Sequence, residues 1–502
     1  MSSADYRSYL RHALNRRKLM GLGAAAGLSA VGLRGGNAFA QGSDTGVDEN
    51  WTPELIRQRA GTLEVDTAAD CAKVVPLDHT GRVSYWYVGP NQASTELDRQ
   101  IHDEFWAAFH ATYPNIEVEQ NNLDYNQMID KVRTAALGGA APAVARMPIL
   151  WGVEFAAKGQ LMEFAPEDVG YATEDFWPGA MKSVTWDGKV YGVPTNNETM
   201  ALIWNAGIFE EAGLPPDEPP ATWADLVAYS KQIKENTGKD GFGMVARVNA
   251  GNTPFRAMPI LWAYGGGALD EAEESPTYQE VFINNDGTKA ALTDYYNMYV
   301  RDKSVPVSAL TNTQTENADP YIAGNLAMVI SHPSEYAKML ELAADATGDD
   351  KAIADQVVEN IRYGLIPEGT VRRSVVFGGS NVHVFNPDIV DGEWDVDSAR
   401  ALIAFSTGPE WSTRQAWTGS NPGHRKGFET TWMQQRLEEI QFLDVTTSML
   451  PYGVPFPVIP ESTEIMNIIV PELLQNVLTE TMTVDEAADD AAAKIEELLT
   501  GL

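Results

Sequence analysis

Cysteine is almost missing from this chain. Cys71 is the only one among 502 residues, so no disulfide can form within the chain and thiolates cannot build a zinc site. The seven histidines lack metal-binding spacings such as His-x-x-x-His, and there is neither a Gly-x-Ser-x-Gly elbow nor a Cys–His nucleophile pattern. The sequence therefore predicts no metal, no cofactor and no catalytic motif.

Positive charge is also scarce. The chain has 36 Lys and Arg against 70 Asp and Glu, a formal net charge of -34. Such an excess of acid disfavours nucleic acid and anionic lipid surfaces as partners. Beyond residue 40 no run of about 18 apolar residues occurs, so no membrane span is predicted in the mature chain. With 44% apolar residues, the chain can still form sizeable cores.

Residues 1–40 have the pattern of an export signal. A long polar segment ends in Arg16-Arg17, an apolar stretch rich in Gly and Ala follows, and Ala38-Phe39-Ala40 provides a small-x-small cleavage site. The paired arginines predict export to the periplasm by the twin-arginine route. A general secretory signal with a chance arginine pair is the alternative.

The mature chain begins with a weakly patterned extension, residues 41–80. From Gly81 onward the pattern sharpens: a strand over 82–88, a helix with apolar residues every four positions from Leu97 to Tyr113, a strand over 116–119 and a helix around 128–132. This alternation favours an α/β fold with a largely parallel sheet. Thr222 and Thr483 are predicted to cap later helices.

Several segments in a fixed order carry a family resemblance. They are 109–118, the small-residue turn 135–142, Asp187-Gly188 through Pro194 followed by 201–205, the strand-like 321–330, and 363–367 with 378–381. From about residue 81 to the C-terminus the chain resembles the extracellular solute-binding proteins of ABC importers, the family that includes maltose-binding protein. The segment after Asp187 is the strongest match, and Ala143 departs from the aspartate that the family often carries.

The resemblance implies a two-lobed periplasmic binding protein of type II, with ligand between lobes joined by a multi-crossing hinge. It places 81–194 and 326–387 in lobe 1 and 195–325 and 388–502 in lobe 2. It further implies a monomer without enzymatic activity that captures a small solute, a sugar or sugar derivative, and delivers it to an ABC transporter permease. Ligand binding to both lobes would stabilise the closed form.

Sugar sites combine aromatic faces with planar polar side chains, and the chain has 13 Trp and 18 Tyr. By its spacing from Asn205, Glu198 matches a glutamate that contacts sugar hydroxyls in the family. The remaining candidates lie on loops at strand ends, near the crossings or in Gly-rich segments. The predicted ligand-binding residues are Asn91, Gln92, Met147, Trp151, Asn197, Glu198, Phe255, Arg256, Trp262, His332, Glu335, Tyr336, Asn381, Trp417 and Arg425.

Other functions stay open at this point. A secreted glycoside hydrolase needs two carboxylates across a cleft, and an acid-rich chain can supply them. A sensor subunit would have the same sequence features as an importer receptor. Ser334 stands where maltose-binding protein has tryptophan, which argues against maltodextrin, and glycerol phosphodiesters, polyols and polyamines are alternative ligands. The acidic balance favours a neutral or cationic ligand, although local charge in the cleft counts for more.

Overall fold

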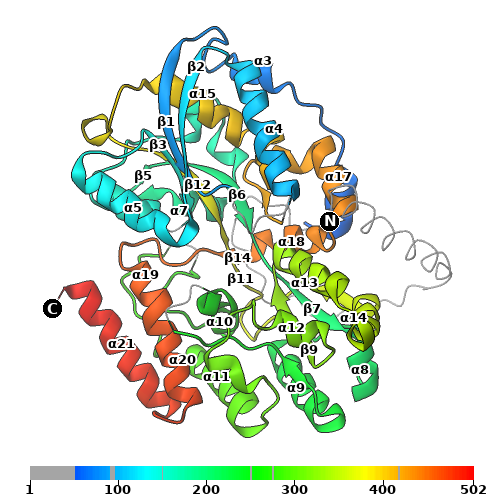
Figure 1. Cartoon of the computed structure of the whole chain (residues 1–502). Coiled ribbons are helices and arrows are strands. Elements are labelled where there is room, and N and C mark those ends of the chain that lie inside the picture. The colour runs from blue at the N-terminus through cyan, green and yellow to red at the C-terminus, as the bar shows by residue number, and fades with distance from the viewer. Residues whose placement is uncertain are drawn as a thin grey trace, which may run out of the picture.

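The computed structural model describes residues 51–90, 96–149, 151–248, 252–273, 276–416 and 419–501. Two β-sheets, one above the other in Figure 1, are each packed against helices and define two lobes. The predicted two-lobed α/β fold is confirmed.

The first lobe is built on a six-stranded sheet of order β13-β6-β12-β3-β1-β2. β1 is parallel to β2 and β3, as predicted, whereas β12 is antiparallel to β3 and β6. The chain enters β12 from the second lobe, so no helical crossover within this sheet sets its direction. The strands are β1 (Gly81–Tyr87), β2 (Ile116–Asn122), β3 (Val144–Pro148), β6 (Val193–Glu198), β12 (Gly378–Val384) and β13 (Asn421–Pro422).

Helix α4 (Glu96–Thr112) covers this sheet with the apolar face that its four-residue period predicted. Ile101, Phe105 and Phe109 are all buried on it. The other helices of the lobe are α5 (Tyr125–Gly138), α6 (Gly152–Ala157), α7 (Pro178–Ser183), α15 (Val396–Thr407), α16 (Pro409–Gln415) and α17 (Thr431–Glu439), and a small hairpin joins β4 (Thr185–Trp186) to β5 (Lys189–Val190).

The second lobe has a four-stranded sheet of order β10-β7-β9-β8, with an apolar core on each face. Its strands are β7 (Ala201–Asn205), β8 (Asp240–Phe242), β9 (Leu326–Ser331) and β10 (Ile361–Gly364). Its helices include α8 (Ala206–Ala212), α9 (Trp223–Thr237), α10 (Asn252–Ala263), α11 (Asp286–Tyr296), α12 (Ala318–Ile322), α13 (Pro333–Asp345), α14 (Gly348–Asn360), α19 (Ser462–Glu464), α20 (Val470–Leu478) and α21 (Val484–Thr500). The predicted caps are present: Thr222 and Thr483 each form a capping box.

The lobe boundaries differ from those predicted. Residues 326–387 were assigned to lobe 1, but β9 and β10 pair with β7 in the second lobe. Residues 388–502 were assigned to lobe 2, but α15 and α16 pack on the first, where Phe405 and Trp411 contact Phe105. A strand buried on both faces has the same apolar pattern in either sheet, so 326–330 did not indicate its sheet.

The lobes are joined where β6 passes into β7 and at two short parallel strands, β11 (Val375–Val376) and β14 (Gly453–Val454). Helix α18 (Leu443–Ser448) lies beside this junction, since the Thr199 hydroxyl donates to the carbonyl of Thr446 at 2.5 Å.

The described part of the extension, 51–80, is folded onto this framework. It forms α2 (Pro53–Arg59) and α3 (Thr67–Cys71). The Trp51 indole donates to the carbonyl of Thr447 at 3.0 Å, and Arg57 pairs with Asp444 at 2.7 Å. Its buried apolar residues, such as Ile56, Cys71 and Val75, are isolated rather than periodic, which is why its sequence looked weakly patterned.

None of the helices in these described ranges is long and apolar enough to cross a bilayer.

Candidate functional site

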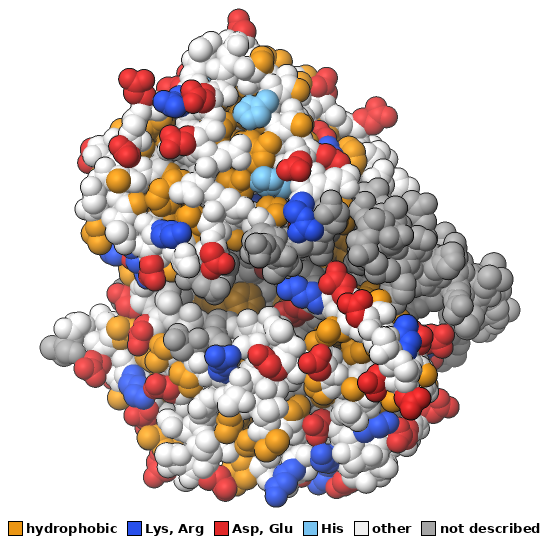
Figure 2. Space-filling view, viewed as in Figure 1, with side chains coloured by type: hydrophobic (Ala, Val, Ile, Leu, Met, Phe, Trp, Pro, Cys, Tyr) orange, Lys and Arg blue, Asp and Glu red, His pale blue; other side chains and the backbone are white. Residues whose placement is uncertain are grey.

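Two cavities, of about 280 and 290 Å³, meet between the lobes. Figure 2 shows this face of the molecule, hollowed at mid-height. The first-lobe cavity lies between β1, α4 and the end of β6, and the interlobe cavity has walls from both lobes. Val88, Arg146, Glu198 and Ser380 line both cavities, so the two form one continuous site.

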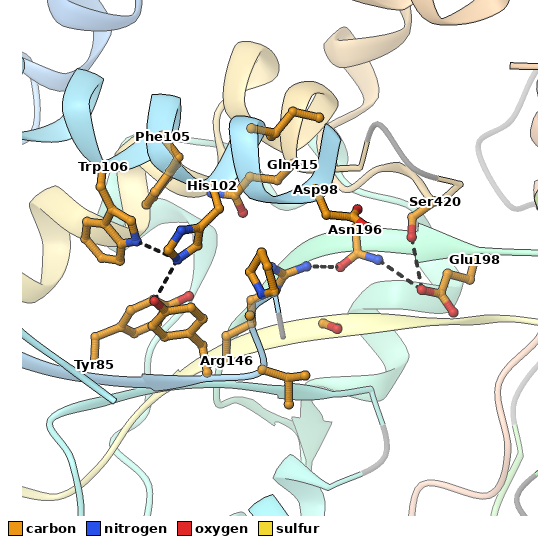
Figure 3. Close-up of a pocket in the computed structure, with 16 residues that line it drawn as sticks. Tyr85, Asp98, His102, Phe105, Trp106, Arg146, Asn196, Glu198, Gln415 and Ser420 are labelled. Carbon is orange, nitrogen blue, oxygen red and sulfur yellow. Dashed lines mark hydrogen bonds between the residues drawn. The ribbon is translucent and has the colours of Figure 1, made fainter. Parts of the chain in front are cut away.

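An aromatic wall closes one side of the first-lobe cavity (Figure 3). The rings of Tyr85 and Tyr87 stack with centroids 4.9 Å apart. The Trp106 indole donates to Nε2 of His102 at 3.1 Å, and the Tyr87 hydroxyl lies 2.8 Å from the same nitrogen. Because an indole N–H can only donate, Nε2 of His102 must accept, which leaves the imidazole proton on Nδ1, facing Asp103 at 3.4 Å.

The tyrosines of this wall keep their protons. Burial raises the pKa of Tyr85, which the nearby charge of Arg146 partly offsets, and burial also raises the pKa of Tyr87. Both hydroxyls can therefore donate a hydrogen bond, and that of Tyr87 donates to Oε1 of Gln120 at 3.1 Å.

A polar chain runs across the floor where the cavities join (Figure 3). Arg146 donates from Nη2 to Oδ1 of Asn196 at 2.8 Å and from Nε to the Thr195 hydroxyl at 3.2 Å. The Asn196 amide then donates to Oε1 of Glu198 at 3.4 Å, and Ser420 donates to the same oxygen at 3.0 Å. The Asn196 side chain thus bridges the Arg146 guanidinium and the Glu198 carboxylate and lies between them.

Backbone geometry at one glycine places Glu198 here. Gly379 of β12 has φ +132°, and a Cβ there would collide with the carbonyl oxygen of Asn196. Glycine is therefore required for β12 to approach the end of β6, next to a register irregularity at Ser380.

The interlobe cavity is more apolar. Trp151, just before α6, faces it from the first lobe, and Phe255 of α10 with Phe456 faces it from the second. The two phenylalanine rings meet edge-to-face, with centroids 5.1 Å apart. Aromatic surfaces on opposite lobes suit the C–H faces of a sugar ring.

Of the predicted ligand-binding residues, Trp151, Glu198 and Phe255 line the cavities. Asn91, Gln92 and Trp417 lie outside the described residues.

Four predicted residues are instead buried away from the cavity lining. Met147 and Trp262 belong to the apolar cores of the two lobes, and the Trp262 indole donates to Glu271. Asn381 donates to Ser183, and Asn197 to the carbonyl of Pro422. For Met147 the reason is strand alternation, which turns Arg146 and Pro148 toward the cavities and Met147 to the other face.

Another group is engaged in contacts within the second lobe. Arg256 and Glu335 form an ion pair at 2.7 Å, and the carboxylate of Glu335 also accepts from the backbone N–H of His332. Tyr336 donates to Gln441 at 2.8 Å. None of these four residues lines either cavity.

Arg425 lies over the ring of Trp177, 5.2 Å from its centroid, and it too lines neither cavity.

Arg146 and the residues of the aromatic wall were not among the predicted ligand-binding residues. The two-residue period of β1 and β3 could have identified Tyr85, Tyr87 and Arg146 as side chains on the cavity face. Ser420 had no such signal, because its place depends on buried Arg436, which donates to the carbonyls of Ala416 and Ser420.

Comparison with known proteins agrees with this architecture. A sequence model described as "Bacterial extracellular solute-binding protein" matches residues 92–412. The sn-glycerol-3-phosphate-binding periplasmic protein UgpB of Shigella dysenteriae is 22% identical over 438 residues, 80% of this chain and 90% of that protein.

Solved structures share the fold. The GacH receptor of Streptomyces glaucescens, studied unliganded and with acarbose, has a TM-score of 0.65 at 22% identity, covering 84% of this chain and 99% of that one. The cyclic alpha-maltosyl-1,6-maltose binding protein of Arthrobacter globiformis has a TM-score of 0.67 at 18% identity, covering 84% and 100%.

Proposed function

Since this chain belongs to the bacterial extracellular solute-binding proteins, whose role is to bind solutes for ABC importers, we propose that its two joined cavities capture a sugar or sugar derivative. The proposal rests on the residues that line the two cavities. Glu198 and Arg146 offer a hydrogen-bond acceptor and donors, while Trp151 and Phe255 offer aromatic faces from opposite lobes. Hydroxyl groups both donate and accept, and sugar C–H faces pack on aromatic rings.

A ligand between these walls would favour lobe closure. A ligand shifts a conformational equilibrium only through contacts that differ between the two states. Contacts with Trp151 and Phe255 at once require both lobes, so they are complete only in a closed form. An ABC transporter permease could then recognise the loaded receptor by its shape.

The test is binding by three cavity variants. A thermal-shift screen of neutral and acidic sugars, polyols and amines would first identify a ligand, because a ligand bound only to the folded state raises stability. Glu198→Gln should then weaken binding by about ten- to a hundredfold, since a hydrogen bond to a charged group contributes about 1.5–3 kcal/mol. Trp151→Ala and Phe255→Ala should weaken it through lost apolar contact.

The matched control is Trp262→Ala, which removes a core indole. It should lower stability by about 3–5 kcal/mol, a loss that the cavity variants should not share. Unchanged affinity in all three cavity variants would refute this placement of the ligand.

We further propose binding without turnover by a monomer. A labelled glycoside that binds should be recovered intact after long incubation. Appearance of product at catalytic yield would instead support the hydrolase alternative, for which Asp98 and Glu198 in the first-lobe cavity would be the carboxylates to test. Sedimentation should give the mass of a single chain.

For export, we propose the twin-arginine route to the periplasm. Residues 1–50 lie outside the described part of the chain, so this rests on Arg16-Arg17 in the sequence alone. Replacing both with Lys should leave precursor in the cytoplasm, and normal maturation of that variant would exclude the route.

A further inference from the structure

Arg146 is a half-buried cation in the cleft, and no carboxylate in the described part of the chain pairs with it. Its guanidinium donates to two neutral acceptors, the Thr195 hydroxyl and the Asn196 amide oxygen. Among the described residues no carboxylate lies within the 4.0 Å of an ion pair. This is unexpected in a chain with nearly twice as many acidic as basic residues.

Three other partly buried arginines are paired with carboxylates. Arg133 is paired with Glu154 at 2.6 Å, and Arg256 with Glu335 at 2.7 Å. Arg414 is paired with Glu410 at 3.2 Å. Arg436 is also buried without a carboxylate, but it donates to the carbonyls of Ala416 and Ser420 and lines neither cavity. A partly desolvated cation is costly without an anion, and at Arg146, which lines both cavities, a ligand can supply the counter-charge.

The guanidinium is also held in one orientation. The bonds from Nε and Nη2 fix its plane, and among the described residues no side chain or carbonyl accepts from Nη1. Because Arg146 lines both cavities, these remaining N–H groups face space that a ligand can enter. A fixed planar fork of this kind fits the oxygens of a carboxylate or phosphate.

The nearest carboxylate of the polar chain does not compete for this position. Asn196 stands between Arg146 and Glu198, and Oε1 of Glu198 already accepts from Asn196 and Ser420. Glu198 therefore suits a hydroxyl donor of the ligand, next to the place where an anionic group would meet Arg146.

Building on the proposed sugar-binding function, we propose that the ligand is a polyhydroxylated acid, whose carboxylate or phosphate binds Arg146 while its hydroxyls bind Glu198. The shared chemistry is an oxyanion beside hydroxyl groups, as in a uronic acid or a sugar phosphate.

The experiment compares acids with their neutral counterparts on the full mature chain. Glucuronate and galacturonate form one arm, glucose 6-phosphate and glycerol 3-phosphate the other, and glucose, galactose and glycerol are the neutral references. Calorimetry with the wild type should show at least one acid binding more tightly than its neutral counterpart by about tenfold or more. The arm in which this occurs distinguishes carboxylate from phosphate.

Arg146→Gln should abolish that preference, because it should lower the affinity for the acid by about tenfold or more beyond any loss of affinity for the neutral sugar. Arg146→Lys keeps the charge without the fork, and it should restore only part of the preference. The control is Arg82→Gln, which removes a guanidinium paired with Glu117 outside the cavities at an exposed position of β1. It should leave the preference intact.

The outcomes separate the two proposals. If neutral sugars bind as tightly as the acids, or if Arg146→Gln keeps the acid preference, the acidic ligand is refuted and sugar binding stands. If no acid and no neutral sugar binds, both are refuted.

Discussion

Acid should destabilise the first lobe through His383 on β12. This imidazole is about 1% exposed, its Nδ1 donates to the carbonyl of Tyr191 at 2.7 Å, and Gly152 and Gly192 lie so close to the ring that a Cβ at either would collide with it. Burial lowers the pKa of His383 from 6.5 to about 4. In mild acid His383 therefore binds a proton in the unfolded chain but not in the folded protein.

The direction and size of this effect on stability follow from the difference in proton binding between the unfolded and folded states. Well above pH 6.5 the imidazole is unprotonated in both states, so His383 adds no pH dependence there. As pH falls from 6.5 toward 4, the unfolded state binds a proton that the folded state does not, and the free energy of unfolding decreases. At pH 5 the loss from this one group is about 2 kcal/mol, and it approaches about 3.4 kcal/mol below pH 4.

The assay is denaturant unfolding of the wild type and of His383→Asn between pH 7.5 and 5. The variant lacks the titrating ring, so the stability difference between the two proteins should shift by about 2 kcal/mol in favour of the variant on acidification. Buried His424, whose pKa burial also lowers to about 4, is present in both and cancels. His110→Asn, at an exposed position of α4, controls for removing an imidazole. A difference between wild type and His383→Asn that stays constant with pH would refute the reasoning.

Two further substitutions probe packing. Trp51→Ala should lower the free energy of unfolding by about 3–5 kcal/mol, because this indole belongs to a buried cluster with Trp177 and Phe428. The control Trp51→Phe keeps an aromatic ring and should lower it less. A negligible loss of stability in Trp51→Ala would mean that the extension is dispensable for folding. Gly287→Ala should lower the free energy of unfolding by about 1–3 kcal/mol, because its Cβ would collide with the backbone of Tyr264 and Gly266. The control Gly138→Ala in α5 places its Cβ near no neighbouring atom, so it should leave the melting temperature unchanged or raise it. Equal effects of the two variants in thermal melting would contradict the packing argument.

Local pattern was enough to predict the α/β class and several elements. The four-residue period of α4 and the capping boxes at Thr222 and Thr483 depend on neighbours within one or two turns. The lobe boundaries depend on which distant strands pair. β9 is buried on both faces, so its sequence is compatible with either sheet, and only its pairing with β7 and β8 assigns it to the second lobe.

For the site as well, some residues could be predicted from local sequence and others depend on distant contacts. Glu198 was predicted from its match to a glutamate of the family and Trp151 from its place on a loop after a strand, and both line the cavities. Met147 was predicted on a loop at a strand end, but it lies within β3 and belongs to the apolar core of the first lobe, because the bounds of β3 were not known. Ser420 could not be predicted at all, since a long-range contact with buried Arg436 positions it.

Net charge and ligand charge need not agree in this protein. A formal charge of -34 suggested a neutral or cationic ligand, but exposed charges are screened beyond about 8 Å at physiological ionic strength. A ligand between the lobes is affected mainly by the groups that contact it, and there Arg146 is a fixed donor whose partners are both neutral. An anionic ligand would lose its water to a guanidinium that is already oriented, whereas a neutral ligand would leave that cation uncompensated. The excess of acidic residues then affects solubility, whereas Arg146 makes the cleft favour an anionic ligand.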